Sequence, residues 1–139
     1  MHVSLVKEYE INTNREKVWN FLTLEITSCI PDIEELENLE DGFKLVIKPR
    51  FAFIKGKFRI ESRIIEKREL EYLKIAIRGS SIGSSFDALI DLTLDNDTKI
   101  ILKIEIDTHG LLKPLSSSLI YEVVNEISSS IISCMSKML

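Results

Sequence analysis

Apolar and polar residues alternate along most of the chain, and this pattern predicts a sheet of antiparallel strands. The alternation is partial over residues 3–11 and regular over residues 55–65, 73–79, 86–94 and 99–107. A period of two puts successive side chains on opposite faces of a strand. We therefore expect half-buried strands with one apolar face and one face in water.

Two shorter signals lie between the first strand and the rest of the sheet. Thr13 and Glu16 have the spacing of a capping box, and the apolar residues that follow them predict a helix of about three turns. Residues 24–30 are interpreted as a second short helical segment. Proline lacks a backbone N–H and disfavours helical geometry in the residue before it, so Pro31 should end this segment and start a strand.

Two glycine-containing segments predict connections between strands. Asp41 and Gly42 predict a tight turn between strands at residues 33–40 and 43–51. Residues 79–85 (GSSIGSS) are expected to form a flexible hairpin loop. They are only superficially similar to a phosphate-binding loop, which needs a following helix and usually a lysine.

Beyond Gly110 the apolar period changes to about 3.6 residues, which predicts a long amphipathic helix. Its apolar stripe contains Leu115, Leu119, Val123, Ile127, Ile131 and Met135. With Pro114 tolerated in its first turn, the helix should have about 25 residues and a length of roughly 37 Å. The fold class expected is α+β: six to seven antiparallel strands that curve around this C-terminal helix, with two short helices after strand 1. A helix is narrower than a curved sheet, so some space should remain between them.

Length and composition indicate one soluble domain over residues 1–139. Hydrophobic residues make up 45% and charged residues 29% of the chain, which excludes a disordered protein. No apolar run reaches the roughly 20 residues of a transmembrane helix, and no signal peptide is recognised, so we expect a cytoplasmic protein. The chain has 21 isoleucines and no glutamine, a bias that indicates a thermophilic source.

Few residues suit metal binding. Cys29 and Cys134 are far apart in the sequence and match no metal-ligand spacing; two reduced core residues are the preferred interpretation, and a disulfide is the alternative. His2 and His109 also lack partners at metal-ligand spacing. We expect no metal and no cofactor.

Positive charge is concentrated in one part of a chain whose net charge is -4. Residues 44–68 contain nine basic and two acidic residues, a local charge of 9 - 2 = +7, so the remainder carries -4 - 7 = -11. These cations either line the solvent side of two strands or form a face that attracts anionic lipid, nucleic acid or an acidic protein.

Aromatic residues alternate with cations over residues 50–58 (RFAFIKGKF). Phe51 and Phe53 either pack inward or form a lip that inserts into a membrane while the cations meet lipid head groups. A base-stacking surface for nucleic acid is disfavoured by the acidic composition, and no nucleic acid is expected as a partner. The residues expected to contact a membrane or a protein partner are Arg50, Lys55, Lys57 and Arg59.

The side chains expected to face the helix are nearly all apolar, so they form either a filled core or a ligand cavity. The wall residues expected for a cavity are Trp19, Cys29, Phe58, Ile60, Ser62, Ile75, Ile90, Ile104, Leu119, Val123 and Ile127, with Phe51 and Phe53 near an entrance. We assign no catalytic residue. An enzyme would need polar groups inside the cavity, for which Ser62, Tyr9 and His109 are weak candidates.

Six segments of the chain resemble the CoxG family of carbon monoxide dehydrogenase subunits, a branch of the START/Bet v 1-like (SRPBCC) superfamily. They are KVWNFL (17–22), CIPD (29–32), DGFKLVIK (41–48), FIKGKF (53–58), the Gly/Ser segment at 79–85 and HGLLKPLSSSLI (109–120). The resemblance covers nearly the whole chain. Asp32 stands where the family usually has glycine, and Ala52-Phe53 stands where it has Gly-Pro.

The resemblance implies a helix-grip fold, in which a curved sheet wraps around the C-terminal helix and leaves a hydrophobic tunnel. It also implies that Pro31 ends a helical pair closing one mouth of the tunnel, with Cys29 and Ile30 on the wall. Family members that accompany molybdenum hydroxylases are connected with lipidic quinones or with placing the enzyme at the membrane. The chain ends at Leu139 without the longer tail of some members, so stable membrane anchoring is not expected.

These observations together lead us to expect a non-enzymatic carrier of a hydrophobic small molecule such as a quinone, an isoprenoid or a lipid. Its partner would be a molybdenum hydroxylase such as carbon monoxide dehydrogenase, and its location the cytoplasm or the inner face of the membrane. One alternative is a polyketide cyclase/dehydratase-like enzyme of the same superfamily. Another is an assembly or membrane-recruitment factor that docks through the basic face.

Overall fold

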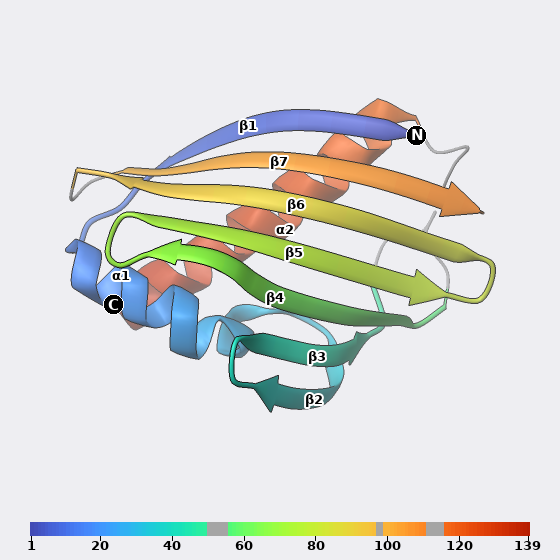
Figure 1. Ribbon diagram of the computed structural model, residues 1–139, viewed down its shortest axis with the longest axis horizontal. Helices are drawn as coiled ribbons and strands as arrows, with labels where there is room; N and C mark the ends of the chain where they lie inside the picture. Colours follow the sequence, from blue (N-terminus) through green and yellow to red (C-terminus); the bar gives the residue numbers. More distant parts are fainter. Residues whose placement is uncertain (50–55, 97–98, 111–115) are drawn as a thin grey trace.

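The computed structural model describes residues 1–49, 56–96, 99–110 and 116–139, which form a seven-stranded antiparallel sheet and a long C-terminal helix (Figure 1). In chain order the elements are β1 (His2–Glu10), α1 (Arg15–Asn20), η1 (Phe21–Glu25), η2 (Ile26–Cys29), β2 (Ile33–Leu39), β3 (Gly42–Ile47), β4 (Phe58–Arg68), β5 (Tyr72–Ser81), β6 (Ser84–Asp95), β7 (Lys99–Gly110) and α2 (Ser117–Met138). The strand order is β1-β7-β6-β5-β4-β3-β2, so the first two strands occupy opposite edges of the sheet. Helix α2 crosses one face of the sheet diagonally (Figure 1).

The helical connection between β1 and β2 changes its hydrogen-bonding type along its length. Helix α1 is followed directly by a π-helical turn, η1, and a 3-10 turn, η2. The N-cap is Asn14, whose side chain accepts a hydrogen bond of 3.0 Å from the backbone N–H of Lys17. The expected cap at Thr13 is therefore wrong by one residue, because asparagine caps a helix as well as threonine does.

The chain leaves this connection as Pro31 predicts, and Asp32 then adopts a φ of 63°. Most L-residues avoid this left-handed region. Asparagine and aspartate tolerate it, and glycine, which has no β-carbon, adopts it freely. The conformation gives a physical reason for the glycine that the resembling family usually has at this position. Strand β2 begins at the next residue.

Residues 79–85 extend the ladder between β5 and β6 and do not form the expected seven-residue loop. Ser80 pairs with Ser85 and Ser81 with Ser84, which leaves a two-residue connection. Glycine at position 79 lets the ring of Phe86 pack against the backbone of β5, because a β-carbon on Gly79 would overlap that ring. The interpretation of this glycine and its serine neighbours as a flexible loop is therefore wrong.

Helix α2 contains 22 residues, Ser117–Met138, slightly fewer than the sequence predicts. Ser116, the residue before it, is the N-cap. The Ser116 hydroxyl accepts a hydrogen bond of 3.3 Å from the backbone N–H of Leu119. Pro114 lies outside the described residues.

Two polar contacts join α2 to β1. The Tyr121 hydroxyl donates to the Ser4 carbonyl at 3.1 Å, and the Lys7 ammonium donates to the Asn125 side chain. These contacts fix which side of α2 faces the β1 edge of the sheet.

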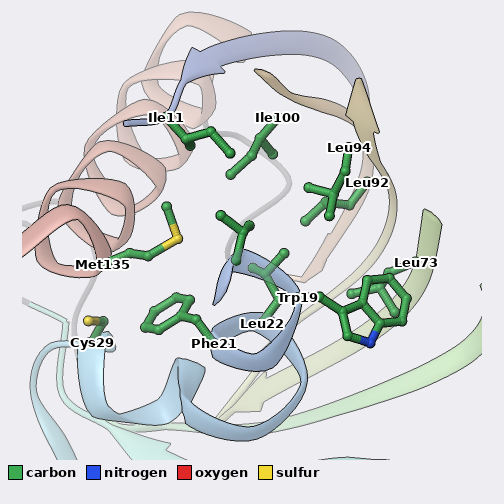
Figure 2. Close-up of a cluster of buried hydrophobic side chains, with 11 residues drawn as sticks. Ile11, Trp19, Phe21, Leu22, Cys29, Leu73, Leu92, Leu94, Ile100 and Met135 are labelled. Carbon is green, nitrogen blue, oxygen red and sulfur yellow. The ribbon is translucent and has the colours of Figure 1, made fainter. Parts of the chain in front are cut away.

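Most of the buried hydrophobic residues form two clusters on the α2 side of the sheet. The helical-end cluster surrounds α1 and the last turns of α2 and consists of Ile11, Val18, Trp19, Phe21, Leu22, Cys29, Leu73, Leu92, Leu94, Ile100 and Met135 (Figure 2). The second, which we call the β1–β7 cluster, consists of Val3, Ile104, Ile106 and Ile120. Ile90 and Leu102 pack against both clusters.

Cys29 and Cys134 form a disulfide between η2 and α2, with a Cα–Cα distance of 5.6 Å. The preferred interpretation of two reduced cysteines is therefore wrong, and the disulfide alternative holds. The sequence separation of 105 residues hides a close spatial approach. It arises because η2 and the end of α2 both pack into the helical-end cluster.

Candidate ligand-binding site

Rows of apolar side chains cross the sheet on the face toward α2, which we call the inner face. In the strand order β4-β5-β6-β7, two neighbouring rows are Ile64, Ile75, Ile90 and Ile104, and Ser62, Ile77, Ala88 and Ile106. Ile60 lies on the same face two residues before Ser62. The alternation of the sequence thus assigned the faces of these strands correctly.

Several inner-face side chains outside the two clusters are partly exposed to solvent. Ile60 and Ile77 on the sheet, and Leu119, Val123 and Ile127 on α2, are half-buried and belong to neither cluster. Closely packed interiors exclude solvent from such side chains. We treat these five residues as the wall of a candidate apolar groove, which we call the inner groove.

Helical periodicity places the three α2 residues on the side away from β1. Tyr121 and Asn125 contact β1, whereas Cys134 contacts η2. At about 100° per residue, Leu119, Val123 and Ile127 lie within roughly 60° of Cys134 around the helix axis. The inner groove therefore runs along the side of α2 that faces η2 and the β2–β4 half of the sheet.

An aromatic pair lies at the end of the inner face where β4 and β6 begin. The ring centroids of Phe58 and Phe86 are 6.2 Å apart at an interplanar angle of 43°, which is a favourable tilted arrangement. The glycine at position 79 makes room for the Phe86 ring. The expected entrance residues Phe51 and Phe53, and the cations Arg50 and Lys55, lie outside the described residues.

Ser62 is the polar residue in the middle of the inner face. It is 6% exposed, and its cross-strand neighbours are Phe43 on β3 and Ile77 on β5. Such a hydroxyl, set among apolar side chains, can orient a polar group of a ligand.

Trp19 and Cys29 lie at the closed end of the interior, in the helical-end cluster. Figure 2 shows their side chains packed with Phe21, Leu22 and Met135. Their exposed fractions are 7% and 6%. Contact of these two residues with a ligand stays a prediction.

The candidate catalytic groups are not brought together. His109 lies on the outer face, where its Nε2 atom is 3.7 Å from Asp87 Oδ2. Tyr9 lies on the inner face of β1, opposite Ile100, six residues along the strand from the row that contains Ser62. Among the described residues, no three histidine, cysteine, aspartate or glutamate side chains are arranged to hold a metal ion.

The outer face carries paired charges, which the local charge count could not show. Arg63 bonds Asp41 at 2.7 Å and Glu61 at 3.1 Å, and Lys57 contacts Glu34 at 3.2 Å. The hydrogen bond from Arg63 holds the pKa of Asp41 below its ordinary value, and the same pairing raises the pKa of Arg63.

A broad depression of about 720 Å³ is lined by some of these outer residues and also by Leu45, Ile60 and Phe86 of the inner-face positions. Its lining includes the charged residues Lys44, Arg59, Glu61, Arg78 and Asp87. Ion pairs join Lys44 to Glu61 and Arg78 to Asp87, so the charged part of this lining is mixed in sign.

No helix in the described part of the chain is long and apolar enough to cross a membrane.

Residues 8–139 match the profile of the CoxG family of carbon monoxide dehydrogenase subunits. A conserved protein from Geobacillus kaustophilus is 20% identical, with a TM-score of 0.75 over 99% of this chain and 94% of that one. Ara h 8.0201 is 15% identical, with a TM-score of 0.70 over 99% and 97% of the two chains. A START superfamily protein from Mycobacterium smegmatis is 12% identical, with a TM-score of 0.67 over all of both chains. These likenesses show a START/Bet v 1-like fold.

A part of Bud site selection protein 4 from Kluyveromyces lactis is 35% identical over 66 residues. That match covers 48% of this chain and 5% of the yeast protein. It therefore carries no functional argument.

Proposed function

Because the chain belongs to the CoxG family of carbon monoxide dehydrogenase subunits, we propose that it is a non-enzymatic carrier that binds a hydrophobic small molecule in the inner groove. The observation that supports this proposal is the set of half-buried apolar side chains on the inner face and on α2 that belong to neither packed cluster. The molecule would be a quinone, an isoprenoid or a lipid. The proposed wall comprises the inner groove together with Phe58, Ser62, Ile75, Ile90 and Ile104, with Trp19 and Cys29 at its closed end.

Apolar burial would supply a large part of the affinity at such a site. Removing about 300 Å² of apolar ligand surface from water contributes about 7 kcal/mol at 25 cal/mol per Å². Association costs reduce this gain, and micromolar binding corresponds to about 8 kcal/mol, so such affinity requires a larger buried area or added polar contacts. A mainly aliphatic wall with one hydroxyl, Ser62, fits a ligand that is mostly hydrocarbon.

The family description supports a further part of the proposal, that the carrier serves a molybdenum hydroxylase such as carbon monoxide dehydrogenase. We place it in the cytoplasm or at the inner face of the membrane. The disulfide fits a cytoplasm if the source is a hyperthermophile, whose intracellular proteins are often rich in disulfides. The isoleucine-rich, glutamine-free composition supports that source.

Docking through the basic face has less support than ligand binding. Lys57 is already paired with Glu34, and Arg63 with two carboxylates. Arg59 makes no ion pair with another described residue and is the cation best placed to contact a partner. An enzymatic role also has less support, because His109 lies on the outer face.

The carrier proposal is tested by filling the inner groove. Val123→Phe adds carbon atoms where the side chain is half-buried, and Val6→Phe adds the same atoms on the outer face of β1, where Val6 is 59% exposed. We expect mass spectrometry of gently purified wild type to detect a hydrophobic molecule, and Val123→Phe to lose it while Val6→Phe keeps it.

The unfolding free energy of the empty variants separates a groove from a filled core. Overpacking a filled core costs about 1–3 kcal/mol, whereas filling an empty groove costs little. A wild type without any bound molecule, combined with a strongly destabilised Val123→Phe, would contradict the carrier proposal.

A further inference from the structure

The disulfide between Cys29 and Cys134 lies where the apolar stripe of α2 passes from the inner groove into the helical-end cluster. The last groove residue of α2 is Ile127, whereas Met135 belongs to the cluster. Cys134 follows Ile127 by about two helical turns, so both point to nearly the same side of α2. The disulfide therefore attaches η2 to α2 just beyond one end of the groove.

The segment that this bond holds consists of two short turns of irregular helix. The π-helical η1 has five residues and the 3-10 helical η2 has four, and neither has a side-chain hydrogen bond at its N-cap. A 3-10 turn has poorer hydrogen-bond geometry than an α-helix, and π-helical turns are rare and often occur at functional sites. Apart from the disulfide, the side-chain contacts from Ser28 and Cys29 to α2 are 3.5 Å and 3.4 Å contacts to the sulfur of Met138. The covalent bond is therefore the strongest restraint that joins η2 to α2 in the described part of the chain.

The two sulfur atoms of the bond differ in access. Cys29 is 6% exposed, and the Sδ atom of Met138 lies 3.4 Å from its Sγ atom. Cys134 is only half-buried. Reduction of a disulfide begins when a thiolate attacks one of the two sulfur atoms, and access contributes to which one is attacked. The Sγ atom of Cys134 is therefore the one that an external thiolate reaches.

We propose that this disulfide is a redox-sensitive closure of the inner groove, opened by a dithiol protein of the thioredoxin class, an inference that rests on the proposed carrier function. One thiolate of the reductant attacks Cys134 Sγ, which forms a mixed disulfide and releases Cys29 as a thiolate. The second thiol of the reductant then attacks the first, which forms the disulfide of the reductant and releases Cys134. Two electrons and two protons pass to the cysteines. The groove then opens at its η2 end and releases the carried molecule faster.

The release rate of a fluorescent probe tests this closure. The probe is N-phenyl-1-naphthylamine, a neutral apolar molecule, and vesicles of phosphatidylcholine in excess take it up after stopped-flow mixing. Reduction of wild type by dithiothreitol should raise the release rate about tenfold, because the opening of a closing segment limits release from many enclosed sites. The variant in which alanine replaces both cysteines should release the probe at the fast rate with or without dithiothreitol.

A variant destabilised elsewhere separates opening of the groove from a general loss of stability. Val3→Ala removes two methyl groups from the β1–β7 cluster, away from η2, and keeps the disulfide. Its melting temperature should fall, but its release rate should stay within about twofold of that of oxidised wild type, because local opening is independent of the stability of a distant cluster. Release from Val3→Ala as fast as from the reduced protein would overturn the inference.

Amide hydrogen exchange without a probe locates the opening independently of any ligand. Reduction should accelerate the exchange of residues 21–29 about tenfold, under conditions in which Val3→Ala leaves their exchange unchanged. Equal exchange of this segment in the oxidised and reduced proteins would show that η2 stays on α2 without the bond, which would overturn the inference.

A thioredoxin that retains only its attacking cysteine identifies the sulfur atom under attack. It should remain attached to Cys134, as read by mass spectrometry of the linked peptides. Attachment to Cys29, or no attachment, would overturn the proposed reduction step.

The remaining outcomes separate the closure from the carrier function. Equal release of the probe from oxidised and reduced wild type would refute the closure and leave the carrier function standing. Failure of wild type to bind the probe in either redox state would count against the carrier function itself, and the closure would fall with it.

Discussion

Reduction of the disulfide between Cys29 and Cys134 should remove a large part of the stability while every side chain is retained. The bond joins η2 to α2 across a sequence separation of 105 residues. In the chain-entropy treatment, closing a loop of about 100 residues restricts the unfolded chain by about 4.7 kcal/mol at 25 °C. Domains are stable by about 5–15 kcal/mol, so this contribution is about a third or more of the total.

Urea unfolding followed by tryptophan fluorescence measures the effect, because the chain has one tryptophan, Trp19, in the same cluster as Cys29. Oxidised and dithiothreitol-reduced wild type should differ by about 4–5 kcal/mol. The melting temperature should fall by about 14 °C, at about 3 °C per kcal/mol for this chain length. The variant with both cysteines replaced by alanine is the control and should not respond to dithiothreitol. A loss below about 1 kcal/mol on reduction would refute the reasoning, because the loop closure would then contribute little.

Gly79→Ala should displace the Phe86 ring, which a β-carbon would overlap, and lower the unfolding free energy by about 1–3 kcal/mol in thermal or urea unfolding; an unchanged value would show that the ring moves aside freely. Gly42→Ala should be more severe, because the added β-carbon would overlap the backbone of β4, and soluble expression is the measurement; a well-expressed variant of normal stability would contradict the close approach. The hydrogen bond that Tyr72 donates to Asp91, together with burial, raises the pKa of Tyr72 to about 12 from 10.0, so the folded protein holds the phenol proton more tightly than the unfolded chain. The stability from this pair is complete below pH 10 and lost between about pH 10 and 12, so the difference in unfolding free energy between wild type and Tyr72→Phe should shrink over that range; a constant difference would refute the assignment.

The sheet could be predicted because each long strand buries one face and exposes the other to solvent. Ile75, Ile90 and Ile104 each have a charged neighbour in their own strands, and they form one cross-strand row in the structure. A shift of register by one residue would move the apolar side chains of a strand into water, which is very costly. The pattern within a single strand therefore indicates which of its faces is buried.

Contacts over long sequence separations could not be predicted in the same way. The bond between Cys29 and Cys134 depends on where η2 lies against the end of α2, and no local pattern contains that information. Gly79 is small because Phe86 lies over it, which is a property of two strands together. A single strand cannot show it.

The sequence indicated the apolar character of the candidate site better than the surroundings of its individual residues. Ser62 stood out because a polar residue interrupts an apolar face, and the structure confirms that it is buried there. Tyr9 was only a weak candidate for a polar group in the cavity, because tyrosine is common in strands and its hydroxyl group usually finds a partner. The lack of a partner for this buried hydroxyl among the described residues emerges only when the β1–β7 ladder and the helical-end cluster are seen together.

The position of β1 at the edge beside β7 affects the order in which the strands can pair during translation. The strands from β2 to β7 each pair with the next strand in the chain, so this meander can grow as the polypeptide leaves the ribosome. Strand β1 can pair only after β7 has been synthesised. The amine of Met1, for example, bonds the carbonyl of Thr108, 107 positions later. Pairings over such separations form slowly. Strand β1 is synthesised before its partner β7 and is therefore among the last strands to be secured, so a bulky domain fused before β1 should hinder this pairing more than one fused after α2.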